Sequence, residues 1–254
     1  MITIGKAANS AMSATKQEII SQLQKELLLL QGFKPALNAA VHAGLEPVEA
    51  AFPNAVFPTA AVHEFLSDAA EQAAATTGFI AGLLAPLMQQ GRVCVWISAA
   101  RTLFPPALAM FGIAPDQIIF VDLQRERDVL WAVEEALKCE GLAAVVGEMR
   151  DISFTASRRL QLAVEQSRVT GFILRHQPRD LNANACVARW RITPLPSGPI
   201  NNIPVIGFPR WHIALIKVRN GKPGEWQLEW AQGRFNMITE NIALQPQADI
   251  RKIG

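Results

Sequence analysis

The sequence predicts an α/β fold, with a mostly parallel central sheet flanked by helices and extended at its carboxyl-terminal end by an antiparallel hairpin. Residues 62–97 read as a strand, a long helix and a second strand, which is how a parallel α/β sheet begins. Two further apolar runs, 118–123 and 142–147, each precede a helical pattern. From residue 186 onward apolar and polar positions alternate between turn sequences, as antiparallel strands require.

A chain of 254 residues with 50% hydrophobic content has room for one sizeable α/β domain and modest appendages. We expect the core to cover residues 44–236, because strand and helix patterns follow one another throughout that range. Residues 237–254 lack periodicity and are expected to be a carboxyl-terminal tail. Residues 1–43 form an amino-terminal segment of their own.

Within this amino-terminal segment, residues 16–30 (KQEIISQLQKELLLL) predict an amphipathic helix. Such a stripe packs on the protein's own sheet or docks onto a partner protein, and the sequence leaves both uses open. The residues of the stripe are Ile19, Ile20, Leu23, Leu27 and Leu30.

The core elements follow in order. A short helix starts at Pro105-Pro106 and ends at Gly112. Residues 118–123 (IIFVDL) are continuously apolar up to Asp122 and predict a strand buried on both faces. The remaining predicted elements are helix 126–139, strand 142–147, helix 155–169, strand 171–175 and the alternating strands CVARWRITPLP, PRWHIALIKVRNG and EWQLEW.

The turn after the first strand occupies the position of a phosphate-binding loop but lacks its chemistry. A Walker loop needs glycines whose backbone N–H groups surround the phosphates, a lysine for the β/γ-phosphates and a Ser or Thr for magnesium. No glycine lies between residues 67 and 77, and no lysine lies between residues 35 and 137. Two carboxylates at the helix start would repel an anion. This degenerate nucleotide loop comprises Ser67, Asp68, Glu71, Thr76 and Thr77.

Glu148 directly follows the predicted strand 142–147. At this position of a nucleotide-hydrolysing sheet an acid holds magnesium or positions water. Without the loop lysine, a structural role and a relic catalytic role remain open for this carboxylate. We predict no catalytic residues, cofactor or metal site, because His42, His63, His176 and His212 are isolated in sequence.

The two halves of the chain differ in charge. Residues 1–149 carry 9 Lys+Arg against 15 Asp+Glu, whereas residues 150–254 carry 15 against 7. Arginine dominates the basic half, and its planar fork suits phosphate contacts. A contact surface for DNA or a partner protein and a solvated surface with scattered arginines are both open. The candidate contact residues are Arg150, Arg158, Arg159, Arg179, Arg189 and Arg191.

Four tryptophans recur among the alternating strands, where they could stack on nucleic-acid bases or fill the core of the sheet. The core is the more ordinary place for such residues. They are Trp190, Trp211, Trp226 and Trp230.

The three cysteines are far apart and lie in apolar contexts, which indicates reduced core thiols and a cytoplasmic protein. The amino terminus lacks a signal-peptide pattern, and the longest apolar run, 78–88, is too short to span a membrane.

The order of motifs resembles the RecA-type recombinase core over residues 44–230. Residues 57–64 (FPTAAVHE) resemble the family's entry segment, AAVVGE its Walker B strand and FILRHQ the strand whose end senses nucleotide. Within that superfamily, longer stretches closely resemble the ImuA family, which is related to SulA-type division inhibitors. These stretches are VHEF, WISAARTLFPPAL, FGIAPDQIIFV, DVLWAVEEAL, SRRLQLAVEQS, ARWRITPLPS and GFPRWHIALIKVRNGKPGEWQLEW.

The resemblance implies a non-catalytic accessory protein of DNA-damage-induced translesion synthesis, part of the SOS response, acting with ImuB and an error-prone DnaE-type polymerase. RecA itself and, weakly, single-stranded DNA are further candidate partners, a homo-oligomer is left open, and no membrane is implied. The DNA loops of RecA would fall near residues 148–155 and 178–186, and both are short here. ATP hydrolysis is not implied, because the Walker lysine and glycines are missing.

Two alternatives belong to other classes of protein. One is an ATP-dependent recombinase-like enzyme, against which the missing lysine counts. The other is a SulA-type cell-division inhibitor, although the complete core with its closing hairpin exceeds what such an inhibitor needs.

Overall fold

The computed structural model describes residues 44–100, 103–197 and 207–238, which all belong to one compact unit, His42–Gly254. The predicted amphipathic helix at 16–30 and the tail from residue 239 lie outside the described residues.

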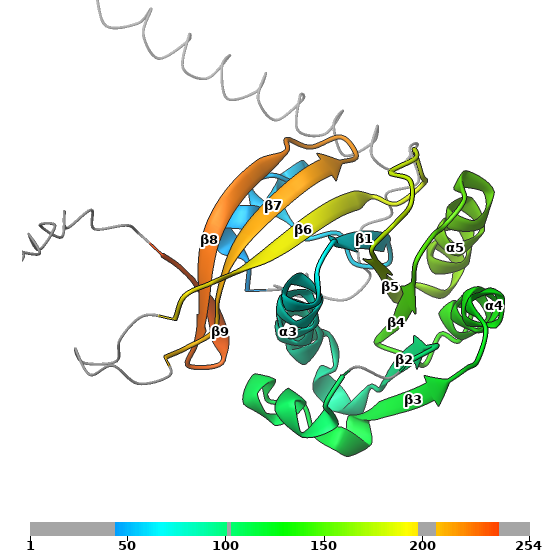
Figure 1. Cartoon of the computed structure of the whole chain (residues 1–254), viewed down its shortest axis with the longest axis horizontal. Helices are drawn as coiled ribbons and strands as arrows, with labels where there is room; N and C mark the ends of the chain where they lie inside the picture. Colours follow the sequence, from blue (N-terminus) through cyan, green and yellow to red (C-terminus); the bar gives the residue numbers. More distant parts are fainter. Residues whose placement is uncertain (1–43, 101–102, 198–206, 239–254) are drawn as a thin grey trace, which may run out of the picture. The chain divides into compact units, whose positions relative to one another are not determined.

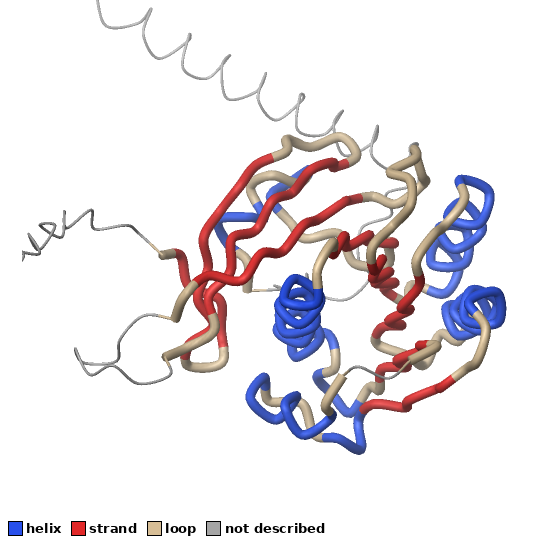
Figure 2. The backbone as a smooth tube through the Cα atoms, in the orientation of Figure 1, coloured by secondary structure: helices blue, strands red, loops and turns tan. Residues whose placement is uncertain are grey.

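A nine-stranded mixed sheet organises the described part of the chain, in the order β3-β2-β4-β5-β1-β6-β7-β8-β9 (Figures 1 and 2). The first six strands run parallel, and β6, β7, β8 and β9 pair with one another in antiparallel fashion. This confirms the predicted fold class. The strands are β1 (Val62–Ser67), β2 (Cys94–Ser98), β3 (Ile118–Asp122), β4 (Ala144–Met149), β5 (Thr170–His176), β6 (Ala188–Leu195), β7 (Arg210–Val218), β8 (Gly224–Ala231) and β9 (Arg234–Met237).

Three long helices connect the parallel strands: α3 (Ala70–Leu87), α4 (Glu126–Leu137) and α5 (Phe154–Ser167). The predicted short helix at 105–112 is confirmed as the 3-10 helix η3 (Pro105–Phe111), which ends at Gly112 with a φ of 78°. The other short elements are α2 (Glu46–Glu49), η1 (Pro53–Ala55), η2 (Gln89–Gly91) and η4 (Pro115–Gln117).

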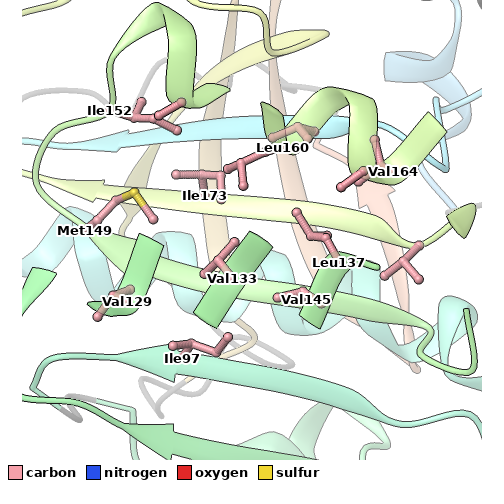
Figure 3. Close-up of a cluster of buried hydrophobic side chains, with 14 of the residues drawn as sticks. Ile97, Val129, Val133, Leu137, Val145, Met149, Ile152, Leu160, Val164 and Ile173 are labelled. Atoms are coloured by element: carbon pink, nitrogen blue, oxygen red, sulfur yellow. The ribbon is translucent and has the colours of Figure 1, made fainter. Parts of the chain in front are cut away.

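Helices α4 and α5 cover one face of the parallel strands, where aliphatic side chains interdigitate (Figure 3). From α4, Val133 and Leu137 are fully buried against Val145 of β4 and Ile173 of β5. The inward positions of both helices recur every three or four residues, which is the periodicity that predicted them.

On the opposite face, α3 packs along β6 (Figure 1). An aromatic core lies between α3 and the antiparallel strands. Phe79 of α3 lies 6.2 Å from Trp190 and 5.1 Å from Phe235, measured between ring centroids. Trp190, Trp211 and Trp230 are all buried. The structure therefore uses these three tryptophans to fill the core, and they are unavailable for stacking on nucleic-acid bases.

Two predictions about burial were wrong. Strand β3 pairs only with β2, so it is an edge strand, and Ile119 is 50% exposed instead of buried. Cys94 and Cys186 are buried thiols as expected, but Cys139 beyond the end of α4 is exposed. A continuous apolar run shows that a segment is hydrophobic, not how many neighbours its strand has.

Candidate functional site

The connection between β1 and α3 consists of Asp68 and Ala69 alone, since β1 ends at Ser67 and α3 begins at Ala70. A Walker loop places about six residues between its strand and its helix so that backbone N–H groups can surround the phosphates. Two residues cannot do this. The strand passes almost directly into the helix, and the positions named from the sequence lie in that junction and in the first turns of α3.

The polar groups of this junction bind one another. Ser67 Oγ and Thr76 Oγ1 are 3.1 Å apart within the buried interior, and the backbone N–H of Asp68 donates to Gln72 Oε1 at 2.9 Å. The Asp68 carboxylate pairs with Arg191 at 3.1 Å. Glu71 lies in the first turn of α3, so negative charge occupies the helix end that would otherwise attract an anion.

Glu148 is buried, with 6% exposure, and both of its carboxylate oxygens are engaged. The indole N–H of Trp96, on β2, donates to Oε1 at 2.6 Å, and His176 Nε2, at the end of β5, lies 3.2 Å from Oε2. Among the described residues this is where the fold brings a carboxylate and an imidazole together at the carboxyl ends of parallel strands. Strand β5 separates β4 from β1, so Glu148 and the β1–α3 junction belong to strands that are not neighbours.

Sequence reasoning missed Trp96 and His176 as partners of Glu148. Trp96 is fully buried in an apolar strand and looks like an ordinary core residue in the sequence. His176 lies at the end of a strand, as active-site residues often do. This position was the one feature of the sequence that could have indicated a role for His176 in the site.

A second polar cluster is buried beneath the opposite face of β1. Glu64 is completely buried and receives Arg175 Nη1 at 2.8 Å and Arg189 Nε at 2.5 Å. These arginines come from β5 and β6, the two strands that flank β1. Both oxygens of the buried carboxylate are therefore paired with a cation, as burial of a charge requires.

The same arginines reach the loop between β5 and β6. Arg175 donates to Asp180 O at 2.8 Å and to Asp151 Oδ1 at 3.1 Å, while Arg189 donates to Asn182 O at 2.7 Å. Desolvation alone would raise the pKa of Asp151, but hydrogen bonds from Arg179 and Arg175 outweigh it and hold that pKa below its usual value.

The candidate contact arginines do not all lie in one place. Arg189 is buried and committed to Glu64, so it is not available for a surface contact. Arg150 and Arg179 are exposed near the carboxyl ends of β4 and β5, and Arg191 on β6 is paired with Asp68. Arg158 and Arg159 are both exposed on α5, but Arg159 is paired with Glu134 of α4.

Within the described ranges, no group of three or more His, Cys, Asp or Glu side chains has the geometry of a metal site. Over the same ranges, no helix combines the length and apolar character needed to cross a bilayer. The apolar stripe at Ile19, Ile20, Leu23, Leu27 and Leu30 falls outside the described residues.

Comparison with curated proteins finds Protein ImuA of Caulobacter vibrioides, in strain NA1000 / CB15N and in strain ATCC 19089 / CIP 103742 / CB 15. Each is 33% identical to this chain over 198 aligned residues, which cover 73% of this chain and 81% of the relative. No family model matches the sequence.

Among solved structures, the chain is similar to the crystal structure of the RadB recombinase, with a TM-score of 0.51. The superposition covers 72% of this chain and 93% of the other, at 10% sequence identity. At that identity the likeness shows the fold alone: a RecA-like sheet with its helices.

Proposed function

The chain belongs to the ImuA family, and from that premise we propose that it is a non-catalytic, RecA-like accessory protein of DNA-damage-induced translesion synthesis. Its role in this proposal is to bind protein partners rather than to turn over nucleotide.

The β1–α3 junction carries the non-catalytic part of the proposal, and the contacts of Glu148 support it. The β1–α3 junction spans two residues, Asp68 and Ala69, and presents carboxylates where a recombinase presents a lysine and backbone N–H groups. The Glu148 carboxylate, which would have to face a magnesium ion or water, is instead engaged by Trp96 and His176. Neither the β1–α3 junction nor the Glu148 carboxylate thus offers what a nucleotide and its magnesium ion need.

The proposed partners follow from the family: ImuB and an error-prone DnaE-type polymerase, with RecA as a further one, in the cytoplasm. The predicted helix at residues 16–30 is proposed as one docking element for them. Weak, salt-dependent contact with single-stranded DNA through exposed arginines is a secondary part of the proposal.

The recombinase-like alternative shares the fold but not the junction. A RecA-like sheet of this topology supports hydrolysis only with a phosphate loop, and the two-residue connection leaves no room for one. The SulA-type alternative finds no particular support in the described residues.

The decisive experiment measures ATP binding and hydrolysis by the purified protein and damage-induced mutation frequency in cells. Purified full-length protein should neither bind ATP at micromolar concentration nor hydrolyse it in the presence of magnesium. A chromosomal deletion in the source bacterium should lower damage-induced mutation frequency, and the wild-type gene should restore it.

The matched variant is Glu148→Gln, which keeps the size of the side chain and still accepts the Trp96 N–H. It should restore mutagenesis as well as the wild type does, because no step requires the carboxylate charge. Magnesium-dependent ATP turnover that disappears in this variant, together with loss of mutagenesis, would overturn the non-catalytic assignment. Unchanged mutation frequency in the deletion strain would overturn the placement in translesion synthesis.

A further inference from the structure

The loop that joins β5 to β6 is anchored on both sides of a solvent-exposed leucine. Arg175 binds the carbonyl of Asp180, and Arg189 binds the carbonyl of Asn182. Leu181 lies between these two anchored residues and is 52% exposed. The backbone at Leu181 is thus held by two buried guanidinium groups, which are themselves held by Glu64.

The same loop is also fastened to the start of α5. The backbone N–H of Arg179 donates to Asp151 Oδ1 at 3.0 Å, and that of Ala185 donates to Ser157 Oγ at 3.0 Å. Phe154, the first residue of α5, lies between those two attachment points and is 58% exposed. Two exposed apolar residues therefore lie on two segments that are hydrogen-bonded to each other at both ends.

This arrangement differs from an ordinary surface loop. Connecting segments are usually polar and mobile, and binding through a mobile segment costs conformational entropy. Here the backbone is ordered in advance by a buried ionic network, whose desolvation is itself costly. A rigid loop that exposes a leucine, and that is hydrogen-bonded to a segment exposing a phenylalanine, is suited to bind another apolar surface, because little ordering remains to be done on binding.

The charge around the two apolar residues is predominantly positive. Arg150 and Arg179 are exposed where the two segments are joined, through Gln177 and Asp151, and the exposed Arg158 lies one helical turn after Phe154, on the same face of α5. The nearby carboxylates are fewer than the arginines, and Asp151 is already shared between Arg175 and Arg179. A complementary partner surface would therefore be acidic.

We propose that Phe154 and Leu181, bordered by Arg150, Arg158 and Arg179, form a docking surface for an acidic protein segment that carries apolar side chains. A protein segment fits better than nucleic acid because Leu181 offers an aliphatic side chain, which packs against apolar side chains and has no ring on which a base can stack. We call this set of five residues the loop–helix surface.

This inference rests on the proposed function, because it supplies a surface for the protein partners of that function. Its test detects the bound partner directly, by photocrosslinking. The full-length chain would carry the photoreactive residue p-benzoylphenylalanine in place of Leu181. This variant would be expressed in DNA-damaged cells of the source bacterium, and the cells would then be irradiated. The matched control carries the same residue in place of Met237, which is 44% exposed on the edge strand β9.

We expect a nuclease-resistant protein adduct from position 181 and none from position 237. Mass spectrometry should map the crosslink to a partner segment with acidic residues next to apolar ones. Adding Arg158→Glu should lower the yield about fivefold or more, because it reverses a charge at the rim. Thermal unfolding of the Arg158→Glu protein should match the wild type, since this side chain is exposed.

A nuclease-sensitive adduct would replace the protein partner with nucleic acid, and a crosslinked segment without acidic residues would remove the charge argument. Absence of an adduct at 181, or a yield that Arg158→Glu leaves unchanged, would overturn the docking surface.

Mutation frequency measured in the same cells separates this failure from failure of the proposed function. Normal, gene-dependent mutagenesis without an adduct rejects the surface alone, whereas an adduct in cells whose mutagenesis does not depend on the gene rejects the function alone.

Discussion

Arg175 Nη1 donates to Glu64 Oε1 across 2.8 Å, although these side chains are only 2% and 0% exposed and stand 111 residues apart in the chain. The pair joins neighbouring strands β5 and β1 on the face covered by α5. With Arg189 it forms a buried network in which one carboxylate serves two cations. The loop between β5 and β6 depends on this network for its backbone anchors.

Replacing Glu64 with Ala should destabilise the protein severely. The change leaves the buried Arg189 guanidinium without its carboxylate and Arg175 with Asp151 alone, and breaking a buried pair typically costs about 3–5 kcal/mol of unfolding free energy. Urea unfolding measures the loss, and hydrogen exchange should rise at residues 178–185. The matched control is Glu135→Ala, which removes the exposed pair with Lys138 and should leave stability unchanged within error. Equal effects of the two substitutions would mean that the buried network contributes no more than a surface pair.

Two glycines of α3 should respond in opposite ways to alanine. At Gly82 a Cβ atom would come within 2.5 Å of Phe235 Cζ, a ring wedged between Phe79 and Trp230. We expect Gly82→Ala to lower stability by about 1–3 kcal/mol, because the aromatic core must shift.

At Gly78 the nearest atoms, on Phe111 and Trp211, lie at 3.4 Å, an ordinary contact distance. Gly78→Ala should therefore be neutral or raise stability by up to about 1 kcal/mol, through the higher helix propensity of alanine. Thermal and urea unfolding of the two variants provide the comparison. A stable Gly82→Ala protein would show that β8 and β9 do not press against α3 in solution.

Acid should weaken the fold through His63. Burial lowers the pKa of this histidine to about 4, although its hydrogen bond to the Pro58 carbonyl acts in the opposite direction. Below about pH 6.5 the unfolded chain binds a proton that the folded protein excludes, so stability falls by about 1.4 kcal/mol per pH unit until about pH 4.

The measurement is unfolding free energy against pH for the wild type and for His63→Phe, which keeps a ring stacked on Phe57. The variant should show a shallower fall between pH 6.5 and pH 4, because the carboxylates titrate equally in both proteins. Parallel curves would indicate that His63 is protonated in the folded state.

Contact with single-stranded DNA should be weak, and Arg158 should contribute more to it than Arg159 does. Arg159 is paired with Glu134, so its charge is partly neutralised before any phosphate approaches. In fluorescence polarisation with a labelled oligonucleotide at low salt, Arg158→Ala should weaken binding more than Arg159→Ala does. Binding should be largely lost at physiological ionic strength, since each phosphate contact releases counterions. Salt-independent binding, or equal binding by both variants and the wild type, would exclude these arginines.

Much of the fold was predictable because its helices and strands depend on residue patterns within short stretches of the sequence. The apolar periodicity at residues 126–139 and 155–169 predicted α4 and α5 to within two residues at each end. Continuous apolar patterns indicated parallel strands, and alternation indicated the antiparallel strands β7 and β8. Strand β6 also alternates, but it pairs in parallel with β1 and in antiparallel fashion only with β7. The missing glycine and lysine after β1 were likewise visible in the sequence, and the two-residue junction is their structural counterpart.

The contacts of the site could not be read in this way. Glu148 is bound by residues 52 and 28 positions away, and Glu64 by residues 111 and 125 positions away. Which side chains meet across such separations depends on the order of strands in the sheet, and periodicity carries no information about that order. The same reason explains Arg189, a surface candidate in the sequence that became a buried partner of Glu64 once β6 paired with β1.

The sequence by itself determined the class of fold, the family and the absence of a phosphate-binding loop, because each depends on residue types at short spacing. Only the tertiary structure decided that the Glu148 carboxylate is engaged by Trp96 and His176, that β3 is an edge strand, and that the segments carrying the exposed Leu181 and Phe154 are hydrogen-bonded to each other. Those outcomes depend on strands and loops brought together from distant parts of the chain, where burial forces each charge to find a partner.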